Sequence, residues 1–199
     1  MEAARLMLSV ADRYKGNNNF EYDLVDVLRQ AITEKGRLVL KVVSAAYKAE
    51  DQDLFAQASQ RFLNLILLQD ELLGTRKEFR VGNWTGMARN IGQTKEEKDL
   101  YEWNARVQIT TWGNHSASER GKLHDYAHKE WNGILKDFYY MRWKTYFDGL
   151  KRSLNGEMAP VLDWYAIEEP WTKVSDTYTA QPEGDCVEVA RRVYTAIFE

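Results

Sequence analysis

The chain has 199 residues, of which 44% are hydrophobic and 29% charged, a composition typical of a folded globular protein. Lys and Arg (27) nearly balance Asp and Glu (30), and no run of five or six like charges occurs, which argues against nucleic-acid binding through a basic face. No apolar run approaches the roughly 18 residues that span a bilayer, so we expect no membrane segment. The single cysteine excludes an internal disulfide.

The first half of the chain is predicted to be helical, because apolar residues recur at three- or four-residue spacing and no proline precedes Pro160. A helix at 2–14 is followed by a polar break at 15–19. A long helix is predicted from about 20 to 49, and a second from 51 to 74, between an N-cap aspartate and a terminating glycine. We expect these two long helices to pack as an antiparallel hairpin.

The second half of the chain continues the pattern. A short helix is predicted at 83–91, and Thr94 is the expected N-cap of a helix that leads to Trp112. After a polar loop at 113–122, the spacing predicts one very long or once-broken helix from 123 to about 154. Two further helices are predicted, one within 159–173 and a last one at 185–198.

The fold class is predicted to be all-α, a bundle-like domain of about seven or eight helices. No strand pattern with a two-residue period persists, and no internal repeat or linker is evident in the sequence. The length is that of one substantial domain, so we expect residues 1–199 to fold as a single unit.

Side chains with catalytic potential are present, but they form no complete set. His124 and His128 are i, i+4 partners on the predicted helix, yet no glutamate lies between them and no third ligand is evident. We therefore interpret them as ordinary helix histidines and expect no metal. Glu168 and Glu169 are adjacent and do not face each other, which favours a solvated face. Cys186 is interpreted as an inert small side chain, and no phosphate-binding motif indicates a cofactor.

Several stretches resemble one known family. The clearest are LQDELLGTRKEFRVGNWTGMAR at 68–89, YEWNARVQITTWG at 101–113 and DYAHKEWNGILKDFYYMRWKTYF at 125–147. FEYDLVDVLRQ at 20–30 and QPEGDCVEVARRV at 181–193 follow the same order. Together they resemble the C-terminal helical domain of α-N-acetylglucosaminidases, glycoside hydrolase family 89, over nearly the whole chain.

The resemblance implies that residues 1–199 are the C-terminal domain of a larger hydrolase. Enzymes of this family release a terminal α-linked N-acetylglucosamine with retention of configuration, using two glutamates on a barrel domain that precedes the helical one. Retention needs both carboxyl groups, so this chain is expected to hold no catalytic residue and to be inactive alone. The implied partners are that barrel and the terminal sugar. The implied location is secreted, periplasmic or lysosomal.

The resemblance also implies three substrate-binding residues on one wall of the sugar pocket. Trp112, in TTWG, and Tyr126, in DYA, match pocket positions of the family, and Leu123 matches a neighbouring aliphatic position. An aromatic plane and a hydroxyl suit the apolar faces and polar edges of a sugar ring. Eleven residues separate Gly113 from Asp125. This loop is longer than the family's short form, which bears on the placement of Leu123 and on the pocket entrance.

Other aromatic and polar residues of the same region are interpreted as structural. Trp131 and Trp143 stand at helical spacing in an apolar stripe, which favours packing. Asn104 and Arg106 are read as structural, since an arginine near a helix end commonly binds carbonyls or a carboxylate. Two alternatives to the glycosidase domain stay open: a non-catalytic glycan-binding module and a purely structural or interaction domain.

Overall fold

The structure, a computed structural model, describes residues 1–198 and is all-α, which confirms the predicted fold class. In this part of the chain there are eight α-helices and no β-strand. The helices are α1 (Glu2–Tyr14), α2 (Asn18–Lys48), α3 (Gln52–Gly74), α4 (Val81–Arg89), α5 (Lys95–Gln108), α6 (Tyr140–Leu154), α7 (Trp164–Lys173) and α8 (Cys186–Phe198). Shorter helical turns cover Lys77–Phe79, Ser116–Arg120 and Leu135–Tyr139. Among the helices of residues 1–198, none combines the length and the apolar character needed to cross a membrane.

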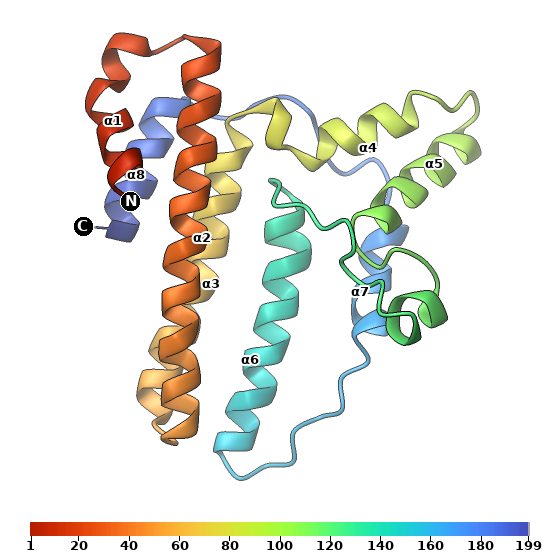
Figure 1. Cartoon of the computed structure of the whole chain (residues 1–199). Helices are drawn as coiled ribbons and strands as arrows, with labels where there is room; N and C mark the ends of the chain where they lie inside the picture. Colours follow the sequence, from red (N-terminus) through yellow and green to blue (C-terminus); the bar gives the residue numbers. More distant parts are fainter. Residues whose placement is uncertain (199) are drawn as a thin grey trace.

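The predicted hairpin of α2 and α3 is the centre of the fold, with α1 and α8 on one side and α6 on the other (Figure 1). Side chains cap the start of both helices. Asn17 accepts a hydrogen bond from the N–H of Phe20 at 3.0 Å, and Asp51 accepts one from Leu54 at 2.9 Å. The fully buried residues of this core include Leu24, Val25, Leu28, Ile32, Phe55, Leu72, Leu73 and Val187.

A smaller group of helices, α4, α5 and α7, lies beyond α6 (Figure 1). The predicted cap of α5 is present, because the side chains of Thr94 and Glu97 each accept a bond from the other residue's backbone. Arg106 ties α5 to α7: its guanidinium lies 4.8 Å from the Trp171 ring centroid and donates to Glu102 at 2.6 Å. Arg106 is fully buried, so the structural interpretation of this arginine is confirmed.

The interpretation of two tryptophans as packing residues is also confirmed. Trp143 on α6 meets Phe62 of α3 edge to face, with ring centroids 4.7 Å apart. Trp131 packs against both hydrophobic clusters, the main core and a smaller one around Val81 and Ile134. Trp131, however, does not lie on a helix.

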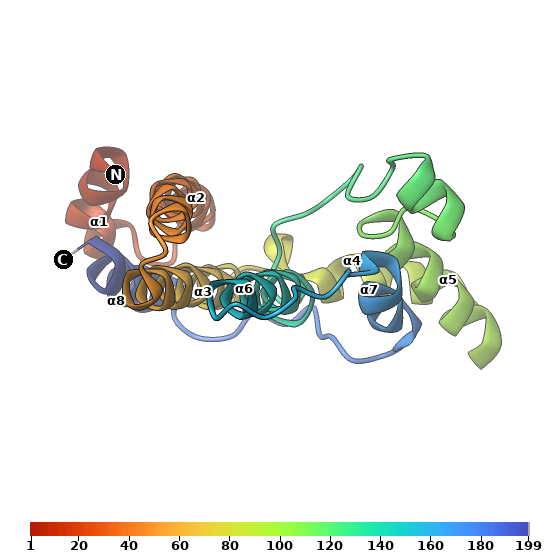
Figure 2. The same ribbon diagram turned by 90° about the horizontal axis from the view of Figure 1, so that it is seen from below.

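The prediction of a helix from residue 123 was wrong, because the chain stays non-helical until Ile134. Left-handed backbone angles occur at Lys122, Asp125 and Gly133, with φ of 55°, 59° and 91°. Such angles are incompatible with a continuous α-helix. Figure 2 shows that this segment rises on the same side as α2, away from the row formed by α3, α6 and α8.

Asp70, a buried residue near the end of α3, explains where this segment ends and helical structure resumes. Its side chain is 5% exposed and accepts hydrogen bonds from the N–H of Gly133 at 2.7 Å, the N–H of Lys136 at 3.0 Å and the amide of Asn132 at 2.8 Å. The carboxylate thus satisfies N–H groups of the first helical turn, which have no partner within the helix. Burial nevertheless raises the pKa of the Asp70 carboxyl to about 6.

The backbone of Asn132 is fixed from a second direction. Its N–H donates to Phe79 at 2.8 Å and its carbonyl accepts from Val81 at 3.1 Å, a short bridge between two distant segments. Gly133 next to it has no room for a side chain, because a Cβ atom there would lie 2.8 Å from a methyl group of Val81. The approach of the chain to α4 therefore requires glycine.

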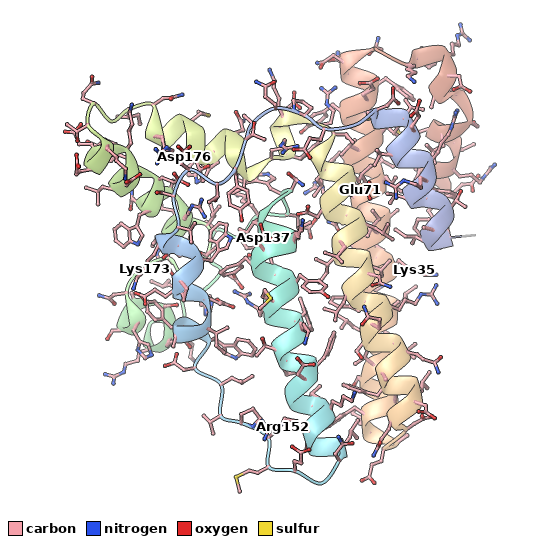
Figure 3. The ribbon with its side chains drawn as sticks, turned by 180° about the vertical axis from the view of Figure 1, so that it is seen from behind. Lys35, Glu71, Asp137, Arg152, Lys173 and Asp176 are labelled. Carbon is pink, nitrogen blue, oxygen red and sulfur yellow. The ribbon has the colours of Figure 1, made fainter. Side chains whose placement is uncertain are left out.

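In the view from behind, Asp137 in the turn Leu135–Tyr139 and Glu71 on α3 lie near the C-terminal segment (Figure 3). Asp137 accepts a hydrogen bond from the hydroxyl of Tyr178 at 2.8 Å. Glu71 of α3 pairs with Arg192 of α8. The C-terminal segment is thus attached along the back of the same row of helices.

We predict that Asp70→Ala lowers the free energy of unfolding by about 2–4 kcal/mol, because the N–H groups of Gly133 and Lys136 lose their side-chain acceptor and the amide of Asn132 keeps only the Asp70 carbonyl. Asp70→Asn, which keeps an acceptor oxygen and the side-chain volume, is the matched control and is expected to cost less. Urea unfolding at pH 7 measures both. An alanine variant as stable as the asparagine variant would contradict the role given to this carboxylate.

The pKa of Asp70 predicts a pH dependence of stability. The folded-state value of about 6 exceeds the ordinary aspartate value of about 3.9, so the folded protein holds this proton more tightly than the unfolded chain does. The stability that comes from this tighter proton binding is therefore full below pH 4 and is lost as the pH rises through 6, whereas the hydrogen bonds that the side chain accepts remain at pH 7. Relative to Asp70→Asn, the free energy of unfolding should fall by roughly 3 kcal/mol across this window. A constant difference between the two proteins from pH 4 to pH 7 would show the prediction to be wrong.

Candidate functional site

Two exposed aromatic rings, on either side of residues 113–125, meet in the connection between α5 and α6. The ring centroids of Trp112 and Tyr126 lie 4.9 Å apart, and their planes are inclined by 56°. Trp112 is 36% exposed and Tyr126 is 70% exposed, so neither belongs to the core. The structure therefore brings together two of the three residues predicted from the sequence, and we call them the aromatic pair. Leu123, the third, is half-buried three residues before Tyr126.

Backbone hydrogen bonds position both rings. The N–H of Trp112 donates to the carbonyl of Val107 at 2.7 Å, which closes the end of α5 with Trp112 in the left-handed region at φ 64°. The N–H of Tyr126 donates to the carbonyl of Leu123 at 3.0 Å and closes a turn. Each ring thus projects from a short hydrogen-bonded turn and not from the open part of the loop.

Asp125 connects these two turns to each other and to α6. Its N–H donates to the carbonyl of Thr110 at 2.9 Å, two residues before Trp112. Its carboxylate accepts a hydrogen bond from the hydroxyl of Tyr139 at 3.0 Å and binds the guanidinium of Arg142 through two nitrogen atoms. Backbone and side chain of one residue therefore hold the segment next to Tyr126 between two helices.

A partly buried cluster of charges surrounds Arg142, next to the loop. Arg142 also binds Glu168 of α7 through two nitrogen atoms, one of them at 2.9 Å from the carboxylate. Glu168 is only 3% exposed. The interpretation of Glu168 as part of a solvated face was therefore wrong. Glu169 is more exposed and pairs with Lys173 at 2.9 Å.

His124 completes this cluster. Its Nε2 atom lies 2.5 Å from Glu168 and its Nδ1 atom 3.1 Å from Glu119. The hydrogen bond with Glu168 raises the pKa of His124, against the opposing effect of burial. His124 and His128 do not share a helix face as expected, because residues 121–133 are not helical. Among residues 1–198, no group of His, Cys, Asp and Glu has the arrangement of a metal site.

The geometry of this site favours binding of a ligand. Asp125 and Glu168, the carboxylates next to the aromatic pair, are both engaged by the guanidinium of Arg142. The exposed rings can bury the apolar face of a ligand, and the hydroxyl of Tyr126 can hydrogen-bond to its edge. Elsewhere, burial raises the pKa of the Cys186 thiol to about 11, in agreement with an inert cysteine.

The sequence interpretation missed Asp125, Arg142 and Glu168. They are separated by 17 and 26 residues along the chain, so no local spacing connects them. One signal was available. Arg142 and Glu168 each stand within an aromatic stretch, and a charge among large apolar residues indicates a buried ion pair.

Residues 1–196 match the family described as the alpha-N-acetylglucosaminidase (NAGLU) C-terminal domain. The human alpha-N-acetylglucosaminidase is 29% identical over 200 residues, which cover 97% of this chain and 26% of the human protein. A family 89 glycoside hydrolase from Clostridium perfringens, solved with 2-acetamido-1,2-dideoxynojirmycin, has a TM-score of 0.92 and 32% identity. That match covers 99% of this chain and 23% of the bacterial one.

A double glutamine variant of the Clostridium perfringens enzyme, in complex with its substrate GlcNAc-alpha-1,4-galactose, gives a TM-score of 0.91 and 33% identity, over 98% of this chain and 23% of that one. The chain thus spans about a quarter of the length of the relatives that it matches. The match over almost the entire sequence shows that the chain belongs to the family of α-N-acetylglucosaminidase C-terminal domains.

Proposed function

We propose that residues 1–199 are the helical C-terminal domain of a retaining α-N-acetylglucosaminidase and that the aromatic pair, with Leu123, forms one wall of the pocket for a terminal α-linked N-acetylglucosamine. The observation that carries the proposal is the pair itself. Trp112 and Tyr126 are adjacent, exposed and fixed by backbone hydrogen bonds. Family membership and the substrate named for the bacterial relative support the identity of the sugar.

The pair suits a sugar because a pyranose ring has apolar C–H faces and polar edges. A tilted pair of rings offers an apolar surface on which such a face can rest, and the tyrosine hydroxyl offers a hydrogen bond to the rim. Ligand pockets combine these two kinds of surface in the same way. The wall orients the sugar, and groups outside this chain break its bond.

The proposal assigns the reaction to a preceding barrel domain of the same polypeptide. A retaining glycosidase needs two carboxyl groups about 5 Å apart, one as nucleophile and one as acid and base. Those groups belong to the proposed barrel, and this chain alone is expected to be inactive. The relatives are about four times as long as the match, which leaves room for such a domain.

Exposed apolar side chains support the presence of a partner domain. Met158 and Val161, in the connection between α6 and α7, are almost fully exposed, and Met87 and Ile91 near the end of α4 are more than half exposed. Surfaces of this kind become buried when domains of one polypeptide pack together.

We predict that Trp112→Ala and Tyr126→Ala each lower kcat/KM of the full polypeptide toward a chromogenic α-N-acetylglucosaminide by about tenfold or more, because an aromatic contact to the sugar contributes roughly 1.5 kcal/mol. Both rings are exposed, so the melting temperature should change little. Trp103→Ala, which removes another exposed tryptophan from α5, is the matched control and should retain activity.

Two other outcomes would contradict the proposal, and each would favour a different function. Unchanged kcat/KM in both variants, accompanied by lower stability, would favour a purely structural domain. N-acetylglucosamine binding by residues 1–199 alone, lost in Trp112→Ala, would instead favour a glycan-binding module that acts without a catalytic partner. Isothermal titration with the free sugar distinguishes this second case.

A further inference from the structure

We propose that Arg142 is a positioning residue for the sugar pocket: through Asp125 it sets the distance and inclination of the aromatic pair. This inference rests on the proposed function, because it assigns the pair to substrate binding. Arg142 does not contact the sugar in this scheme and acts only through the loop.

Asp125 is attached to the rest of the structure at two points. Its backbone N–H is bound to Thr110, on the Trp112 side of the loop, and its carboxylate is bound to Arg142 of α6. Tyr126 is the next residue. Any movement of Asp125 along the guanidinium therefore displaces one ring relative to the other.

The guanidinium of Arg142 is held in one orientation by its neighbours. It lies 4.9 Å from the ring centroids of both Phe138 and Tyr139, and it is bound by the carboxylates of Asp125 and Glu168. A planar guanidinium that is stacked and doubly paired has one orientation, which a lysine ammonium at the same place cannot reproduce. The anchor for Asp125 is therefore directional.

The charged cluster joins elements that are far apart in the sequence. Arg142 comes from α6 and Glu168 from α7, whereas Asp125 and His124 come from the segment that rises away from the row of helices (Figure 2). The cluster thus joins this segment to two helices at the base of the aromatic pair. A lysine at 142 would keep the positive charge between the carboxylates while releasing the fixed geometry.

The test uses Arg142→Lys and a matched control, Arg80→Lys. Arg80 is a buried arginine, whereas Arg142 is half-buried, and Arg80 binds Gly74, Thr179 and Glu183. Loss of a paired guanidinium should lower the melting temperature in both variants. Fluorine NMR of the chain labelled with 5-fluorotryptophan gives the first measurement, and the Trp112 resonance is assigned as the one that is absent in Trp112→Phe. This resonance should shift in Arg142→Lys and keep its position in Arg80→Lys.

Kinetics of the full polypeptide give the second measurement. Arg142→Lys should raise KM for the chromogenic α-N-acetylglucosaminide about tenfold and change kcat less, because misplaced binding groups weaken ground-state contacts. In a Tyr126→Ala background the same substitution should have little further effect, since the ring that it positions is gone. Arg80→Lys should leave KM unchanged.

An unmoved Trp112 resonance, or effects of Arg142→Lys and Tyr126→Ala on kcat/KM that simply multiply, would overturn the positioning role of Arg142. Failure of the proposed function has a different signature. In that case Trp112→Ala and Tyr126→Ala would themselves leave kcat/KM unchanged, whatever the resonance of Trp112 does in Arg142→Lys.

Discussion

The carboxylate of Asp70 is the interaction on which the arrangement of the second half of the chain depends. It binds the N–H groups of Gly133 and Lys136 at the start of the second helical run, which fixes the point where the polypeptide returns to the central hairpin. Residues 121–133, which lead to that point from the α5 side, have no helical structure. This segment carries Asp125 and Tyr126, so a buried acid on one helix fixes one end of the segment that bears an exposed ring.

Sequence patterns predicted the parts of the fold that local interactions determine. The caps at Asp51 and Thr94 and the apolar stripes of α2 and α3 lie within a few residues of the structure that they produce. The segment at 121–133 has comparable apolar spacing, yet it is not helical. Contacts with residues more than 50 positions away in sequence override the local preference of this segment for a helix.

In the candidate site, too, the residues could be named from the sequence, whereas contacts between distant residues could not be predicted. Trp112 and Tyr126 were singled out by family resemblance, and their adjacency follows from the Asp125 to Thr110 bond, which no sequence spacing reveals. The buried charges were misjudged because glutamate is usually solvated. Glu168 is instead paired with Arg142 and His124, which repays part of the cost of removing a carboxylate from water.

The loop of eleven residues between Gly113 and Asp125 is attached at both ends independently of its own length. Trp112 is held by Val107, and Asp125 by Thr110 and Arg142, so the intervening residues close a gap whose ends are already fixed. Insertions or deletions before Leu123 and His124, which belong to the site and to the charged cluster, change the loop-closure entropy only slowly with length. The stretch is thus a place where evolution, or an engineer, can vary the rim of the site while its two aromatic rings keep their separation.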